Sequence, residues 1–168
     1  ISEKDGKSGP LCFVTIEHEI YSENELCITE EQDLVYLRDK VQSQPSKPAK
    51  SMIENADFRK KIIPSEILLF RYSALTFNGH RIHYDVDYSR NVEGYDGLVF
   101  HGPLTATLLL ELAIKHSNEP INTYSFKGKS PLTNLQEFWI EGKFVDGGIT
   151  LWAKQRDGIV AMEANALF

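Results

Sequence analysis

The segment "LTFNGHRIHYD", residues 75–85, brings two histidines, an arginine, an asparagine and an aspartate into one short stretch. An imidazole titrates near neutral pH, so His83 is the best candidate for a general base. Asn78 lies five positions earlier, and Gly79 between them permits a tight turn, so both side chains are expected to reach one pocket. Asp85 either orients His83 or lies on the surface. The segment therefore predicts a loop capable of acid–base catalysis.

A more ordinary interpretation is that His80 and His83 cap loops and bind backbone groups. The segment "FHGPL", residues 100–104, favours the catalytic interpretation, because Gly102 opens a helix that is expected to be buried. Free backbone N–H groups and the positive end of the helix dipole meet at such a start. They suit a developing oxyanion, for example the enolate oxygen of a thioester. An ordinary helix cap is the alternative.

The element that must carry this oxyanion site is a helix that begins at Gly102 and Pro103, since proline suits the first turn. The segment is apolar on most sides, which is typical of a buried helix, and it ends near residues 117–120. Turn signals such as "DGG" and "RDG" then separate four predicted strands. These strands cover residues 121–129, 137–145, 149–155 and 159–168. The order predicts an α+β fold in which an antiparallel sheet wraps around the helix.

Two shorter helical segments flank the polar loop. "SEILLFRYSALTF", residues 65–77, predicts a short helix with Ser65 as its cap after Pro64. Residues 84–95 are polar and predict about one helical turn. The candidate catalytic loop is thus expected to lie between two helical segments.

The N-terminal part of the chain has a different sequence pattern, which is typical of strands. Residues 11–20 and 26–36 predict a β-hairpin with its turn near residues 22–25. Only ten residues precede Leu11, so nothing before the hairpin is expected to complete a sheet, and the hairpin must lean on another surface. Its pattern resembles that of the last two predicted strands, which favours a repeat. Residues 41–61 are polar, contain prolines and predict a linker with weak helical potential.

Composition and charge exclude several classes of protein. A net charge of −6 and a pI of about 5.4 argue against a general nucleic-acid binder, although a local basic pocket for a phosphorylated ligand remains compatible. No run approaches the roughly 20 apolar residues that a membrane helix needs. Cys12 and Cys27 do not face each other in the predicted hairpin, so no disulfide is expected, and two isolated cysteines give no zinc pattern. Reduced thiols fit an intracellular protein.

Two sequence blocks together, "YSALTFNGHRIHYD" and "GLVFHGPLTATLLLEL", resemble the MaoC-like hot-dog family, the type 2 enoyl-CoA hydratases. Thr76 matches the small hydroxyl position of the family motif and Ile82 its aliphatic position. His83 matches the catalytic histidine, and His101 with Gly102 matches the segment before the central helix. The resemblance covers roughly residues 62–168 and implies a complete hot-dog domain.

The departures from the motif indicate a particular branch. Phe77 replaces a glycine, Asn78 stands at the catalytic aspartate, and His80 and Arg81 replace asparagine and proline. This form resembles the mesaconyl-C4-CoA (3-methylfumaryl-CoA) hydratase-like proteins, which border the mitochondrial type 2 hydroxyacyl-thioester dehydratases. Members commonly carry two hot-dog halves, so residues 1–40 are interpreted as the remnant of an N-terminal half.

The resemblance implies an enzyme that adds or removes water at the 2,3-position of an acyl thioester, carried by coenzyme A or acyl carrier protein. His83 would transfer protons, Asn78 would hold the water, and the N–H of Gly102 would meet the oxyanion. His101 is grouped with the substrate-binding residues, as are His80 and Arg81. The last two either recognise a second carboxylate on the acyl group or, in the case of Arg81, shape the loop.

The resemblance implies no metal and no redox cofactor, no nucleic-acid or membrane partner, and a homodimer or paired hot-dog halves. The cytoplasm and the mitochondrial matrix are both compatible compartments. Two alternatives stay open. An acyl-CoA thioesterase would need a carboxylate on or near the central helix, where Glu111 is the acid available. A non-catalytic acyl-thioester-binding module would explain the missing aspartate.

Overall fold

The computed structural model describes residues 1–6, 9–37 and 55–168 and divides the chain into two units, Ile1–Lys47 and Pro48–Phe168. Each unit is treated by itself. None of the described helices is long and apolar enough to cross a membrane.

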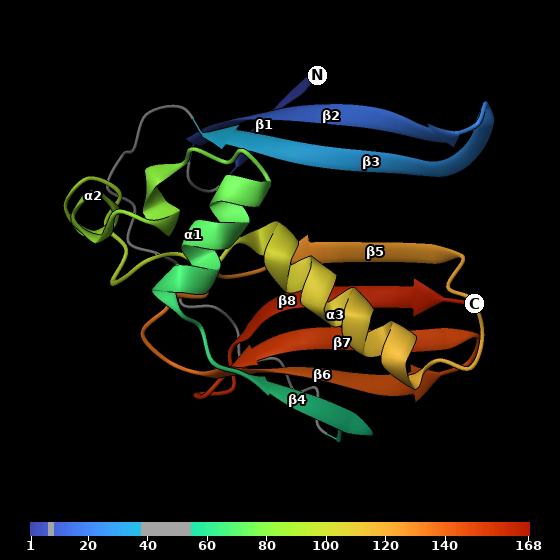
Figure 1. Ribbon diagram of the computed structural model, residues 1–168. Helices are drawn as coiled ribbons and strands as arrows, with labels where there is room; N and C mark the ends of the chain where they lie inside the picture. The colour runs from blue at the N-terminus through green and yellow to red at the C-terminus, as the bar shows by residue number, and fades with distance from the viewer. Residues whose placement is uncertain (7–8, 38–54) are drawn as a thin grey trace. The chain divides into compact units, whose positions relative to one another are not determined.

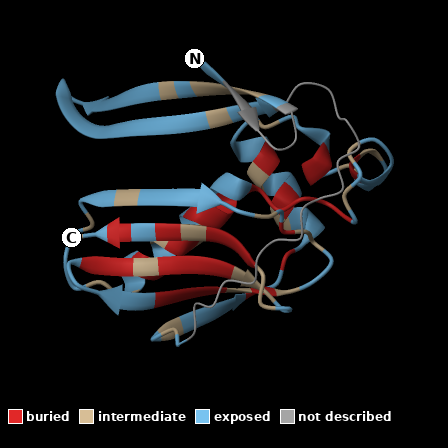
Figure 2. Ribbon diagram, turned by 180° about the vertical axis from the view of Figure 1, so that it is seen from behind, coloured by how far each residue is buried: buried red, intermediate tan, exposed pale blue. Residues whose placement is uncertain are grey.

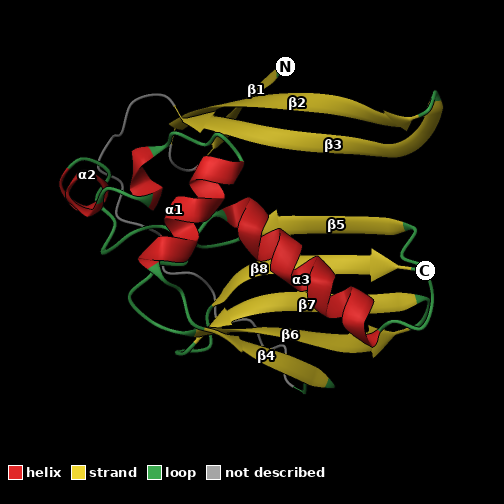
Figure 3. Cartoon of the chain, viewed as in Figure 1, coloured by secondary structure: helices red, strands yellow, loops and turns green. Residues whose placement is uncertain are grey.

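The N-terminal unit is an antiparallel sheet in the order β1-β2-β3 (Figure 3). Its strands are β1 (Ser2–Gly6), β2 (Gly9–Ser22) and β3 (Glu25–Leu37). The predicted hairpin is confirmed, and Glu23 and Asn24 both have positive φ, as a tight two-residue turn requires. The expectation that nothing could complete the sheet is wrong, because β1 pairs with the start of β2.

The two cysteines lie apart in this sheet, as predicted. Cys12 pairs with Tyr36, and Cys27 lies at the register shift opposite Ile20 and Tyr21. Both thiols are free.

The C-terminal unit is a five-stranded antiparallel sheet in the order β4-β6-β7-β8-β5, with the long helix α3 lying across one face (Figure 1). The helix α3 spans Gly102–His116. The strands are β4 (Phe58–Ile62), β5 (Thr123–Gly128), β6 (Phe138–Val145), β7 (Gly148–Gln155) and β8 (Val160–Leu167). The predicted helix and the four strands after it are confirmed.

Strand β4 corrects the predicted linker. Phe58–Ile62 pairs along its whole length with β6, so the last residues of the range 41–61 belong to the sheet. The prediction was misled by three consecutive cations, which suit a solvated edge strand as well as a linker. Residues 41–54 of the predicted linker lie outside the described residues.

The core of this unit lies between α3 and the sheet, and the central strands β6, β7 and β8 carry most of its buried residues (Figure 2). Leu109 and Ala113 of α3 are fully buried, as are Ile140, Ile149 and Leu151 of the facing strands. Ile149 and Leu151, two positions apart in β7, therefore face the core together, and α3 packs on the sheet through its buried side.

The polar loop lies beside the first turn of α3. Helix α1 (Glu66–Leu75) begins with Ser65 as its cap, whose hydroxyl accepts a bond from Leu68 N, as predicted. The short 3₁₀ helix η1 (Arg81–His83) and helix α2 (Val86–Asn91) follow. The segment before α3 is held on both sides, since Val99 N donates to Ile82 O and Phe100 N to Leu132 O. The first of these bonds holds η1 against residues 99–100, which lead into α3.

Candidate active site

His83 is buried at the end of η1, and its Nδ1 lies 2.8 Å from the carbonyl oxygen of Val99. A carbonyl can only accept, so Nδ1 carries the hydrogen and Nε2 keeps the lone pair in the neutral ring. Burial is the main cause that lowers the pKa of His83; the Val99 carbonyl opposes this shift, and the nearby His80 adds to it. His83 is therefore a neutral base at pH 7, with Nε2 as the atom that can take a proton.

His101 stacks on His83. The two ring centroids are 3.7 Å apart and the planes differ by 16°. His101 Nε2 lies 2.9 Å from the hydroxyl of Ser73, and the ring of Tyr72 meets His101 edge-on at 4.8 Å. Burial and then the neighbouring His83 lower the pKa of His101 to about 4. This candidate for substrate binding is fully buried against the ring of His83 rather than open to a ligand.

Asn78 makes hydrogen bonds within the loop that follows α1. Its backbone N donates to Ser73 O, and its Oδ1 accepts a 3.1 Å bond from His80 N. The acceptor end of the amide is thus used within the loop, and the Nδ2 end is the one available to a ligand. Phe77 just before it has a φ of 52°, a left-handed conformation that favours glycine. Phe77 therefore adopts a backbone conformation that is rare for a residue with a side chain, at the position where the family motif has glycine.

A shallow depression of about 280 Å³ adjoins Asn78. It is lined mainly by apolar groups, and its residues are Phe70, Ser73, Ala74, Phe77, Asn78, Gly79 and Tyr84. An apolar group placed there would lie beside Asn78 and Ser73, two of the residues that line the depression.

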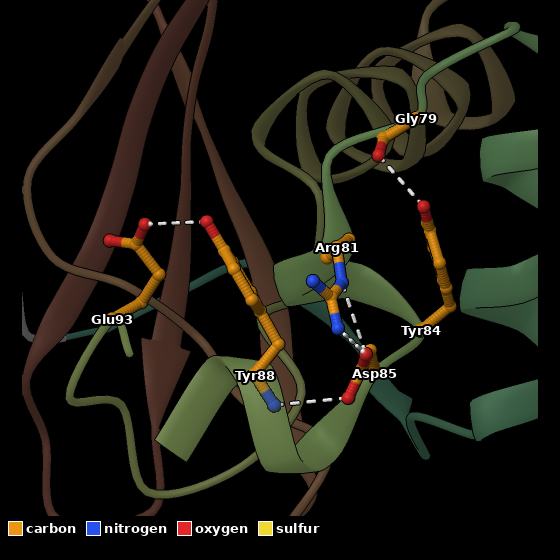
Figure 4. Close-up of polar contacts among 6 residues, drawn as sticks. All are labelled: Gly79, Arg81, Tyr84, Asp85, Tyr88 and Glu93. Carbon is orange, nitrogen blue, oxygen red and sulfur yellow. Dashed lines mark hydrogen bonds and ion pairs between the residues drawn. The ribbon is translucent and has the colours of Figure 1, made fainter. Parts of the chain in front are cut away.

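Arg81 and Asp85 form an ion pair that organises the loop (Figure 4). Arg81 donates from Nε and Nη2 to Asp85 Oδ2 at 3.1 and 2.6 Å, and its guanidinium lies 4.3 Å from the centre of the Tyr88 ring. The other carboxylate oxygen of Asp85 caps α2 by accepting from Tyr88 N. This N–H and then the Arg81 bond lower the pKa of Asp85, so Asp85 serves the loop as a permanent anion and is a poor substitute base.

Gly102 is the first residue of α3, so its N–H has no acceptor within the helix. The preceding His101 makes no capping bond with its side chain, and Pro103 contributes no N–H. A Cβ added at Gly102 would come no closer than 4.0 Å to a neighbouring side chain, that of Met162. Packing does not require the glycine, and its absence of a side chain keeps the amide accessible.

The structure thus brings His83 and His101 together, with Gly102 next in the chain, while Asn78 and His80 lie in the adjoining loop. Glu111 is not part of this group. It is nine positions after Gly102, about 13 Å along the helix axis, and its exposed carboxylate lies 4.0 Å from Lys60 of β4. The carboxylate that a hot-dog thioesterase would need is therefore not supplied by Glu111.

Sequence reasoning missed Ser73 and the carbonyl of Val99. Ser73 lies within an apolar helix, 28 positions from the histidine that it contacts. The Val99 carbonyl is a backbone group, so no residue type in the sequence indicates that it binds His83. The one hint was a small polar residue among apolar ones in "LLFRYSALTF", which by itself is common on helix surfaces.

Comparisons of sequence and of structure found known proteins that are similar to this chain. The model of a family described as hydroxyacyl-thioester dehydratase type 2 matches residues 2–134. Mesaconyl-C(4)-CoA hydratase of Chloroflexus aurantiacus is 44% identical over 165 residues, which are 98% of this chain and 59% of that protein. A mitochondrial hydroxyacyl-thioester dehydratase type 2 of Schizosaccharomyces pombe is 38% identical over 66% of this chain and 35% of its own length.

Among solved structures, a MaoC-like dehydratase from Phytophthora capsici superimposes with a TM-score of 0.71 at 15% identity, covering 100% of this chain and 62% of that one. The predicted hot-dog fold is thereby confirmed. The chain spans three fifths or less of the length of the curated relatives described above.

Proposed function

Because the chain belongs to the hydroxyacyl-thioester dehydratase type 2 family, we propose that it is a carbon–oxygen lyase that hydrates 2-enoyl thioesters or dehydrates 3-hydroxyacyl thioesters. The observation that carries this proposal is the pairing of His83, a neutral histidine with a defined basic nitrogen, with the open first turn of α3. One supplies proton transfer and the other a site for negative charge. The carrier of the acyl group would be coenzyme A or acyl carrier protein.

In the hydration direction, Nε2 of His83 takes a proton from water as the water oxygen bonds to C3 of the enoyl group. The electrons of the double bond move toward the thioester carbonyl, whose oxygen becomes enolate-like. The N–H of Gly102 stabilises that oxygen, a contribution typically worth about 3 kcal/mol in the transition state. His83 then returns its proton to C2, so atoms and charge balance, and dehydration is the same path reversed.

Asn78 supports this step without ionising. Its Oδ1 is used by His80 N, so the amide would hold the water through an Nδ2–H donated to the water oxygen. The water hydrogens then remain free to point at Nε2 of His83. One histidine would thus carry the proton in both directions, and the asparagine would supply orientation alone.

The acyl group would contact two features of the protein, an apolar depression and a cationic side chain. The apolar depression beside Asn78 suits a methyl or short alkyl portion. A second carboxylate, as in the mesaconyl group named for the Chloroflexus relative, would bind at Arg81, whose side chain is 55% exposed and holds Asp85 through Nε and Nη2. His80 at the N-terminal end of η1 would be its second donor.

We also propose that residues 1–40 are the remnant of an N-terminal hot-dog half and that residues 62–168, together with strand β4 (Phe58–Ile62), form the MaoC-like domain. The coverage of the Chloroflexus relative, 98% of this chain but 59% of that protein, supports a chain that contains one complete half and part of another. The three-stranded sheet in the N-terminal unit is compatible with such a remnant.

The test is a direct assay of the purified chain with mesaconyl-, crotonyl- and 3-hydroxyacyl-CoA, following the absorbance of the conjugated double bond. His83→Ala is expected to reduce turnover by at least about 100-fold, the usual scale for a general acid–base group. His18→Ala is the matched control, since His18 pairs with Glu30 on the exposed hairpin of the other unit. Equal turnover in His83→Ala and wild type would refute the assignment.

The same samples separate the competing functions. Release of free thiol without loss of the double bond would identify a thioesterase. Binding of the acyl-CoA with no turnover of any substrate would identify a non-catalytic module.

A further inference from the structure

Ser73 and His101 form a pair that the acid–base chemistry of His83 does not itself use. They come from α1 and from the residue before α3, and both are buried, with His101 fully so. The Ser73 hydroxyl lies 2.9 Å from His101 Nε2, and the His101 ring lies parallel to that of His83 at 3.7 Å. The order of contacts is therefore Ser73, His101, His83, and then the carbonyl of Val99.

His101 is an unusual residue to bury at this point. Among the described residues, its Nδ1 is the buried side-chain nitrogen that has no hydrogen-bond partner. If Ser73 donates to Nε2, Nδ1 carries an unpaired hydrogen; if Nε2 donates to Ser73, Nδ1 carries an unpaired lone pair. Buried polar atoms nearly always find a partner, so a phenylalanine would be the less costly aromatic here. The imidazole must therefore contribute something that packing alone does not.

We propose that Ser73 and His101 are positioning residues for His83. The Ser73 hydroxyl fixes the plane of the His101 ring, and the stacked His101 ring fixes the plane of His83. Together with the Val99 carbonyl, this leaves His83 one orientation, in which Nε2 is the proton-accepting atom. The inference rests on the proposed function, because it assigns a role relative to the catalytic step of His83.

The stack also explains how a single histidine can carry the proton. When Nε2 takes a proton, the imidazolium lies against the face of a neutral aromatic ring, and such a face attracts a cation. Burial keeps His101 neutral at the pH of catalysis, since it lowers the pKa of that ring to about 4. The other titratable groups at the stack are His80, edge-on to His83 at 5.7 Å, and Tyr72, edge-on to His101.

The experiment compares Ser73→Ala with Ser73→Thr, which keeps the hydroxyl, and with Ser89→Ala. Ser89 is the matched control, because it is another buried serine and donates to Gly97 O at 2.7 Å. Two readouts are taken on the full chain: the pH profile of kcat/KM for enoyl-CoA hydration, and the ¹⁵N shifts of the His83 ring through a pH titration. The ring shifts need no substrate.

In Ser73→Ala we expect kcat to fall by about tenfold to a hundredfold with KM within about twofold, as for a misplaced catalytic group. The pKa of His83 should rise toward its ordinary value as water reaches the loosened stack, so the acidic limb of the profile moves to higher pH. Ser73→Thr and Ser89→Ala should keep the wild-type limb and ring shifts. If Ser73→Ala does not fold, Ser73→Cys replaces the hydroxyl with a weakly bonding thiol and is read in the same way.

The proposal is overturned if the His83 titration and the profile in Ser73→Ala match those in Ser89→Ala. Wild-type protein without hydration activity would instead count against the proposed function. In that case the ¹⁵N titration alone still decides whether Ser73 controls the state of His83.

Discussion

Asn78 has an acceptor and a donor in its side chain, and an aspartate at this position would keep only the acceptor. Its Oδ1 closes a tight turn by accepting from His80 N, and its Nδ2 is the group that we propose holds the water. An aspartate could close the same turn but would offer an oxygen where the amide offers a donor. In the proposed mechanism, an asparagine at this position would donate to the oxygen of the water, whereas an aspartate would accept one of its hydrogens.

Asn78→Asp tests this division. The turn should persist, so the thermal unfolding midpoint should stay within about 2 °C of wild type. Turnover should fall by about tenfold or more, equivalent to about 1.4 kcal/mol in the barrier, because the donor is lost. Asn78→Ala removes both functions and should lower turnover and stability together. Faster hydration by Asn78→Asp, measured at saturating enoyl-CoA, would show that a carboxylate base is preferred and that the donor is unnecessary.

The two stacked histidines give the fold a pH dependence. The pKa of His101 is lowered to about 4 and that of His83 is lowered as well, whereas an unfolded histidine titrates near 6.5. Between these values the unfolded chain binds protons that the folded chain does not, so the free energy of unfolding decreases as pH falls from about 6.5 to about 4. Each such histidine contributes a slope of at most about 1.4 kcal/mol per pH unit.

His101→Phe removes one of these sites while keeping an aromatic ring. Urea unfolding at several pH values should then show a shallower slope in this window, by up to one proton. His116→Phe, at a half-buried histidine that stacks on Phe58, controls for the exchange of an imidazole for a phenyl ring elsewhere in the fold. Equal slopes for His101→Phe and wild type would mean that His101 already titrates normally in the folded protein.

The residues of the candidate catalytic loop could be selected from the sequence by residue type, but the buried contacts behind them could not. His83, Asn78 and Gly102 stand out because imidazoles, amides and a glycine at a helix start carry recognisable chemistry. The ring of His101 was assigned to the substrate, yet the fold buries it completely. Sequence spacing cannot decide this, since it depends on α1 packing beside the start of α3. Arg81 had two interpretations: its bonds to Asp85 show the ion pair that shapes the loop, and binding of a substrate carboxylate stays a prediction.

Among the helices and strands, the elements predicted correctly were those whose sequence signals lie within a single segment. The cap at Ser65, the proline start of α3 and the glycine turns between the last strands each depend on local chemistry, and each was predicted. Strands β1 and β4 were missed because both are short and polar, and they are strands only through their partners β2 and β6. The strand propensity of these two segments alone could not predict that they form strands.

The outer face of the sheet contains an ion pair whose contribution is predictable from its burial. Ile140 and Leu151 face the core, so Glu141 and Trp152 lie on the opposite face. Glu141 Oε2 accepts from Trp152 Nε1 and binds Lys154 Nζ, both at 2.6 Å, and its carboxylate is almost fully buried. Removing it would leave an indole N–H and an ammonium without their acceptor.

Glu141→Ala should lower the free energy of unfolding by about 3 kcal/mol, because a buried charge and a buried donor both lose their partner. Glu137→Ala is the matched control in the same sheet region. Its carboxylate binds Lys61 at 2.8 Å but is more exposed, so its loss should cost less than about 1 kcal/mol. Urea denaturation of both variants measures the difference, and a loss below 1 kcal/mol for Glu141→Ala would contradict the burial argument.

At the scale of the whole molecule, the two edges of the five-stranded sheet differ in character. Strand β4 carries Arg59, Lys60 and Lys61 in a row, the kind of charged edge that resists further pairing. Strand β5 pairs with β8 alone in the described part of the chain, and its Phe126 is 49% exposed. The β5 edge is therefore the one suited to a second copy of the chain.

We expect the chain to form a homodimer through β5, with a mass by light scattering of twice 19.1 kDa. A two-fold interface would place the β5 strands of both copies beside each other, so Phe126→Lys introduces two like charges and should raise the dimer dissociation constant at least about tenfold. Phe144→Lys is the matched control: Phe144 is also 49% exposed but lies in β6, between β4 and β7. Sedimentation across a concentration series should show dissociation of Phe126→Lys alone. Equal behaviour of the two variants would move the interface away from β5, and a wild-type monomer at all concentrations would exclude a homodimer.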